Sequence, residues 1–150
     1  MGGDHAGIRL KVVLVERLRT DGHEVVDLGT FDETPVDFPD VAQRTCAAVL
    51  DGSAERAILV CGTGVGAAIA SNKIPGIRAA VGHDVYSAHQ AVEHDDVNVL
   101  CLGADVVGPT LAVELVQTYL AARFDSAPEF ARRVAMLAVM DEGRPSVGTA

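Results

Sequence analysis

A short apolar run followed by three alternate glycines constrains the fold of this chain more than any other segment. Residues 57–60 read Ala-Ile-Leu-Val, and residues 61–66 follow as Cys-Gly-Thr-Gly-Val-Gly. A helix-like pattern continues through residues 67–70. Glycine permits the tight turn with which a buried strand can lead directly into a helix. The segment therefore predicts a strand–loop–helix unit of the kind that builds parallel α/β sheets.

Apolar runs and helical patterns alternate in the same way along most of the chain. Strands are expected over residues 24–28, 56–60, 78–81 and 97–102, and helices over residues 8–19, 41–50, 64–71, 85–93, 111–123 and 129–140. This order predicts a single α/β domain with a doubly wound, Rossmann-like parallel sheet between two layers of helices. The domain is expected to cover residues 1–142, and residues 143–150 to form a mobile tail.

The region before Gly103 and two loops are expected at the edge of this sheet where ligands bind, beyond the carboxyl ends of the strands. One is residues 61–66, and the other is residues 3–7, which read Gly-Asp-His-Ala-Gly. Only Met1 and Gly2 precede the second loop, so either the sequence starts inside a longer chain or the sheet lacks most of one strand. The N–H groups of a glycine loop and the following helix form a nest for an anion, such as a phosphate or an oxyanion. Cys61 is placed to act there as a base or nucleophile.

Composition argues against several classes of protein. Apolar residues make up 49% of the chain, which is incompatible with disorder, yet neither a membrane-spanning run nor a signal-peptide pattern is present. The net charge of −9 without a basic cluster argues against nucleic-acid binding. The chain has three widely spaced cysteines, and this odd number argues against a disulfide framework or a zinc site. Two of them, Cys46 and Cys101, are expected to be buried structural thiols. A cytoplasmic protein is expected.

Several motifs together resemble the ribose-5-phosphate isomerase B family, which also includes the galactose-6-phosphate isomerase subunits. The matching segments follow the family's order and spacing, and they are residues 3–7, 37–40, 61–66, 71–79, 86–88, 93–94, 98–100 and 106–108. The resemblance implies aldose–ketose isomerisation without a metal or cofactor. In this family the sugar ring is opened first, and a base then moves a proton between two adjacent carbons through a cis-enediolate.

The resemblance also implies roles for individual residues. Cys61 matches the base, and Thr63 matches a residue that assists proton movement. Ring-opening or hydroxyl contacts are matched by Asp4 and His94, and phosphate contacts by His5 and Arg133. The other expected substrate-binding residues are Gly62, Gly64, Val65, Gly66 and Asp95. Because two subunits share each active site in this family, a homodimer or a tetramer of dimers is expected.

Four positions depart from the family's usual pattern. Phe38 stands where tyrosine is usual, and Asp95 where asparagine is usual. Asp105 and Glu129 stand where arginine is common. Arginine suits phosphate through its planar fork of donors, whereas a carboxylate repels phosphate. These departures predict isomerase chemistry for which ribose 5-phosphate is a poor substrate.

Other interpretations remain open at this point. Cys61 can be a small buried residue, Asp4 an N-cap of the first helix, His94 a helix C-cap and Arg133 a solvated charge. The chain can also be a non-catalytic or regulatory sugar-binding homologue. A generic nucleotide-binding domain is disfavoured, because the glycine loop lacks the dinucleotide spacing and Val81 stands where an acidic residue is expected.

Overall fold

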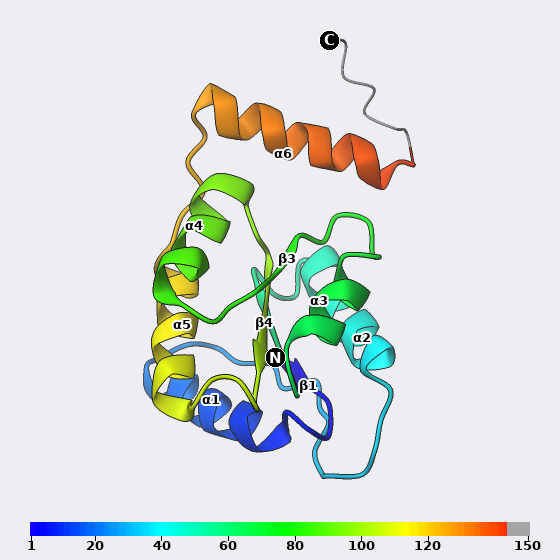
Figure 1. Cartoon of the computed structure of the whole chain (residues 1–150), viewed down its shortest axis with the longest axis vertical. Coiled ribbons are helices and arrows are strands. Elements are labelled where there is room, and N and C mark those ends of the chain that lie inside the picture. The colour runs from blue at the N-terminus through cyan, green and yellow to red at the C-terminus, as the bar shows by residue number, and fades with distance from the viewer. Residues whose placement is uncertain (144–150) are drawn as a thin grey trace.

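The computed structural model describes residues 1–143, so the expected tail lies outside the described residues except for Gly143. Strands and helices alternate along these residues (Figure 1). The strands are β1 (Gly2–Gly3), β2 (Ala57–Cys61), β3 (Ala79–Val81) and β4 (Val99–Gly103). The helices are α1 (Ile8–Thr20), α2 (Phe38–Leu50), α3 (Val65–Ser71), α4 (Val85–Asp95), α5 (Pro109–Ala121) and α6 (Pro128–Asp141). Within residues 1–143, none of the helices combines the length and apolarity that a membrane crossing needs.

The sheet is parallel throughout, with the strand order β1-β2-β4-β3. Gly3 pairs with Val60 in β2, and Cys61 pairs with Gly103 in β4. Every residue of β2 and β4 is buried, as expected for central strands of a parallel sheet covered on both faces. The predicted doubly wound α/β fold is therefore confirmed, and the carboxyl ends of β1, β2 and β4 meet at one edge.

Helices cover both faces of the sheet (Figure 1). Helices α1, α4 and α5 pack on one face, and α2 and α3 on the other. Side chains alternate along a strand, so Ile58 and Val60 join the first layer of core residues, while Leu59 and Cys61 join the second. The side chain of Cys61 therefore faces the layer of α2 and α3.

The prediction of a regular strand over residues 24–28 is wrong. The segment runs beside the first residues of the chain and exchanges backbone hydrogen bonds with Met1, which directly precedes β1. The amino group of Met1 donates to the Val26 carbonyl at 2.6 Å, and the N–H of Leu28 donates to the Met1 carbonyl at 2.8 Å. Since β1 has only two residues, it offers too few backbone partners for a regular ladder.

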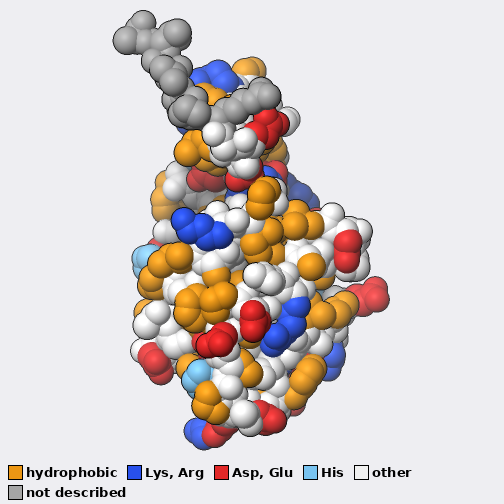
Figure 2. All heavy atoms as spheres, turned by 90° about the vertical axis from the view of Figure 1, so that its right-hand side faces the viewer, with side chains coloured by type: hydrophobic (Ala, Val, Ile, Leu, Met, Phe, Trp, Pro, Cys, Tyr) orange, Lys and Arg blue, Asp and Glu red, His pale blue; other side chains and the backbone are white. Residues whose placement is uncertain are grey.

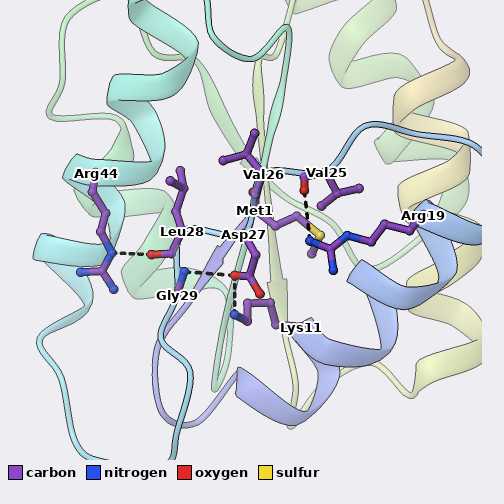
Figure 3. Close-up of polar contacts among 9 residues, drawn as sticks. All are labelled: Met1, Lys11, Arg19, Val25, Val26, Asp27, Leu28, Gly29 and Arg44. Carbon is purple, nitrogen blue, oxygen red and sulfur yellow. Dashed lines mark hydrogen bonds and ion pairs between the residues drawn. The ribbon is translucent and has the colours of Figure 1, made fainter.

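An ion pair between buried Lys11 and half-buried Asp27 holds this segment against α1 (Figure 3). Lys11 is 1% exposed, and its Nζ lies 2.5 Å from Oδ1 of Asp27, which also accepts the N–H of Gly29 at 3.0 Å. Burial alone would raise the pKa of Asp27, but the hydrogen bonds from Lys11 and Gly29 outweigh it and hold the pKa below its usual value. Arg19 and Arg44 each donate to a carbonyl of the segment. The chain leading to residues 31–37 is thus anchored by side chains.

Candidate active site

Cys61 is the last residue of β2, and its sulfur lies under the glycine loop. Its Sγ accepts a hydrogen bond from the N–H of Gly64 at 3.1 Å, and the residue is 6% exposed. Gly64 has a φ of 80°, and a Cβ there would lie 3.2 Å from the carbonyl carbon of Leu102. Both the left-handed backbone and the close approach of β4 require glycine at this position. The turn into α3 therefore aims a backbone donor at the thiol.

The chain leaving β4 packs against the same loop. A side chain at Gly103 would collide with the backbone of Thr63. The N–H of Asp105 donates to the carbonyl of Gly62 at 2.9 Å, and a Cβ at Gly62 would lie 3.2 Å from Oδ2 of Asp105. The structure thus places the Asp105 carboxylate directly beside the glycine loop.

The loop of residues 3–7 packs on the end of β2. The N–H of Asp4 donates to the carbonyl of Val60 at 3.1 Å, and any side chain at Gly7 would collide with that carbonyl. Asp4 is 8% exposed, and its Oδ1 accepts the N–H groups of Ala6 and Gly7, each at 3.0 Å. The interpretation of Asp4 as the N-cap of α1 is wrong, because Gly7 occupies that position. Asp4 instead holds its own loop beside Cys61.

Two more side chains border this edge. His5 is exposed, and its Nδ1 accepts the N–H of Val36 at 3.3 Å. Helix α2 starts at Phe38, earlier than expected, because Pro39 fits the first turn of a helix. The ring of Phe38 packs on the glycine loop, where a Cβ at Gly66 would lie 3.3 Å from it. The position where tyrosine is usual is thus an apolar wall of the loop.

The remaining predicted site residues lie elsewhere in the chain. His94 is in the last turn of α4, which continues to Asp95, so the C-cap interpretation is wrong because Asp96 takes that place. The His94 ring stacks on Phe130 of α6, with centroids 4.1 Å apart and planes at 16°. The guanidinium carbon of Arg133 lies 5.8 Å from the centroid of the same Phe130 ring.

The predicted site residues thus form two groups. The cysteine half-site is Asp4, His5, Phe38, residues 61–66 and Asp105, and the histidine half-site is His94, Asp95, Glu129, Phe130 and Arg133. Helix α4 leads back from the carboxyl edge of the sheet to its amino edge, where β4 begins. A five-residue strand such as β4 spans about 13 Å, so one chain holds its half-sites at opposite edges of the sheet (Figure 1).

The other two cysteines lie in the core, as expected for structural thiols. Cys46 and Cys101 are fully buried, and burial raises the pKa of both thiols, which keeps them uncharged. All three cysteines are free among residues 1–143. Over the same residues, the structure brings no three histidine, cysteine or acidic side chains together as metal ligands would be. Among its groups, the cysteine half-site offers the thiol of Cys61, the buried carboxylate of Asp4 and the backbone N–H of Gly64.

The fold and the site together define a parallel α/β protein with a buried thiol under a glycine loop at the carboxyl edge of its sheet, where the loop that carries buried Asp4 also packs. The ribose/galactose isomerase family model matches residues 1–137. Ribose-5-phosphate isomerase B of Escherichia coli is 41% identical over 138 residues, covering 92% of this chain and 93% of that protein. D-erythrulose-4-phosphate isomerase 2 of Mycolicibacterium smegmatis is 43% identical over 138 residues, covering 89% of this chain and 90% of that protein.

The solved structure of Clostridium thermocellum ribose-5-phosphate isomerase B superposes with a TM-score of 0.92. It is 42% identical and covers 95% of each chain. The chain belongs to the ribose/galactose isomerase family. The resemblance predicted from the motifs is therefore confirmed.

Proposed function

We propose that this protein is an aldose–ketose isomerase that opens the ring of a small sugar or sugar phosphate and moves a proton through a cis-enediolate. One observation carries the proposal: the Sγ of Cys61 lies 3.1 Å from a donor of the glycine loop, at the end of β2 on which the loop of buried Asp4 packs. The Escherichia coli and Mycolicibacterium smegmatis relatives, named isomerases of a pentose phosphate and a tetrose phosphate, support the reaction class.

In the proposed step, the Cys61 thiolate takes the proton from the carbon beside the carbonyl and returns it to the former carbonyl carbon. The C–H electron pair forms the enediolate double bond, and the carbonyl pair moves onto oxygen. Backbone N–H groups of residues 62–66 stabilise this charge, as oxyanion donors do. Thr63, on the same loop, passes a proton between the two substrate oxygens. Since one carbon is oxidised as its neighbour is reduced, no external redox cofactor is needed.

We also propose that the histidine half-site of a second copy completes the cysteine half-site. Two observations support this assembly. Among the described residues, none in α6 is buried, although Met136, Leu137, Val139 and Met140 are apolar and between 39% and 55% exposed. Figure 2 faces α2 and α3 and shows hydrophobic side chains gathered across that side of the molecule. Exposed apolar residues on these two helices are Phe38, Leu50, Val65 and Ile69.

Light scattering is expected to give a homodimer, or a tetramer of dimers, rather than a monomer of 15.6 kDa at micromolar concentration. Leu137→Glu should favour monomers, because a charge in an apolar interface is costly to desolvate. Val12→Glu is the matched control, since Val12 is equally an exposed apolar helix residue, on α1. A monomeric wild-type protein would contradict the assembly.

An isomerisation assay tests the proposed reaction. Tetroses, pentoses and hexoses, each with and without a terminal phosphate, are incubated with the protein and followed by NMR. Interconversion of one aldose–ketose pair is the expected result. Binding of a sugar without conversion would favour the alternative of a non-catalytic sugar-binding homologue. If the protein neither binds nor converts any sugar of the panel, both the isomerase and the sugar-binding alternative are contradicted.

We further propose that the protein needs no metal or cofactor and acts in the cytoplasm. Three cysteines that are free within residues 1–143 suit a reducing compartment. Turnover that is unchanged by a chelator is the expected result for the reaction.

A further inference from the structure

The imidazole of His94 is held by a neighbour on its own helix. Nε2 of Gln90 lies 3.1 Å from Nδ1 of His94, one helical turn away on α4. An amide nitrogen can only donate a hydrogen bond, so Nδ1 of the ring accepts it. A neutral histidine that accepts at Nδ1 carries its hydrogen on Nε2. Gln90 therefore selects the tautomer that presents Nε2–H as a donor.

Phe130 fixes the plane of the same ring. The two rings are stacked, with centroids 4.1 Å apart and an interplanar angle of 16°. The Glu93 carboxylate lies 3.6 Å from Nε2, which is too long for a hydrogen bond. The His94 side chain is 32% exposed. Its Nε2–H can therefore be offered to an incoming molecule.

We propose that Gln90 and Phe130 are positioning residues, which hold His94 as a neutral Nε2–H donor to the ring oxygen of a cyclic sugar. This inference rests on the proposed function. During ring opening the anomeric hydroxyl loses its proton, and its electron pair forms the carbonyl. The pair of the broken C–O bond stays on the ring oxygen, which gains a proton. The proton thus moves from one substrate oxygen to the other. Until it arrives, Nε2–H stabilises the negative charge on the ring oxygen by donating a hydrogen bond, as a neutral histidine can.

Two sugar phosphates separate ring opening from the later proton transfer. Ribose 5-phosphate closes to a furanose, whereas erythrose 4-phosphate cannot, because its O4 carries the phosphate. Gln90→Leu and Phe130→Leu should each lower kcat/KM for ribose 5-phosphate about tenfold. Gln90→Leu should leave kcat/KM for erythrose 4-phosphate within about twofold of the wild-type value. Phe130→Leu is measured on ribose 5-phosphate alone, because its ring also contacts Arg133.

Conservative variants sharpen the expectation. Gln90→Glu places an acceptor beside Nδ1, which favours the Nδ1–H tautomer, so its loss on ribose 5-phosphate should exceed that of Gln90→Leu. Phe130→Tyr keeps the stacked ring, so its loss on ribose 5-phosphate should be smaller than that of Phe130→Leu. Gln117→Leu is the matched control, because Gln117 bonds Asp21 at 2.8 Å on another part of the surface.

Nitrogen-15 NMR of the imidazole reports the tautomer directly. The wild-type His94 should show Nε2–H, and Gln90→Glu should shift it toward Nδ1–H. Equal losses of Gln90→Leu on both sugars, or an Nδ1–H tautomer in the wild type, would overturn the positioning role while leaving the proposed isomerase intact. A wild-type protein that converts neither sugar, nor any other in the panel, would overturn the proposed function and this inference with it.

Discussion

Replacing Cys61 with serine is expected to lower the turnover number of isomerisation by about 10²-fold or more, within the range for losing an acid–base group. A serine hydroxyl is much harder to deprotonate than a thiol and is therefore a poor base near neutral pH. The fold should persist, because the two side chains are nearly equal in size. The N–H of Gly64, which now donates to the sulfur, can donate to the serine oxygen instead. A thermal melt and the turnover number measure the two effects separately.

Chemical modification supplies an independent check on Cys61. Iodoacetamide should inactivate the wild-type protein, and a bound substrate should slow the inactivation. Cys46→Ala is the matched control, since Cys46 is a second buried thiol outside the cysteine half-site. It should keep the turnover number of the folded protein and the sensitivity to iodoacetamide. Near-normal turnover of Cys61→Ser would make Cys61 structural and require another base.

The double change Asp105→Arg and Glu129→Arg is expected to improve the use of ribose 5-phosphate, mainly through a lower KM. Asp105 belongs to the cysteine half-site and Glu129 to the first turn of α6 in the histidine half-site. The two carboxylates therefore face one ligand only if two chains build the site. Each charge-assisted hydrogen bond that an arginine restores adds about 1.5–3 kcal/mol, or roughly one to two decades in affinity.

Steady-state kinetics on ribose 5-phosphate measures this change, with both single variants for comparison. Glu16→Arg with Glu114→Arg is the matched control, because it changes the net charge equally at exposed positions on α1 and α5. The control pair should leave KM unchanged. Efficient turnover of ribose 5-phosphate by the unmodified protein would contradict the account of these two carboxylates. It would also mean that His5, Arg133 and the backbone hold the phosphate well enough.

The unit of β2, the glycine loop and α3 could be predicted because its signals are local. A continuous apolar run indicates a strand buried on both faces, and the glycines mark its exit into a helix. The closeness of Asp4 and Cys61 followed from the rule that strand ends share one edge. The strand expected over residues 24–28 failed, because a strand depends on its neighbour, and β1 offers only two residues for pairing.

The histidine half-site could not be predicted in this detail. The stack of His94 on Phe130 joins α4 and α6, and no local pattern records a contact between helices so far apart in sequence. The hydrogen bond between Gln90 and His94 could be predicted from the sequence only if His94 belongs to the helix, because residues four apart then share a helical face. The expected helix ended at residue 93, whereas α4 continues to Asp95. The separation of the two half-sites could also be predicted from the order of strands and helices. A helix that follows a parallel strand returns to the opposite edge of the sheet.

Mixing two inactive variants tests the central claim, that two chains build one isomerase site, most directly. Cys61→Ser chains are combined with His94→Ala chains, allowed to exchange subunits, and assayed on the ring-closing sugar phosphate that the wild type converts best. Random exchange makes about half of the dimers mixed, and each mixed dimer regains one intact site of two. Recovery of roughly a quarter of the wild-type activity is the predicted result. No recovery from a fully exchanged mixture would contradict a site shared between two chains.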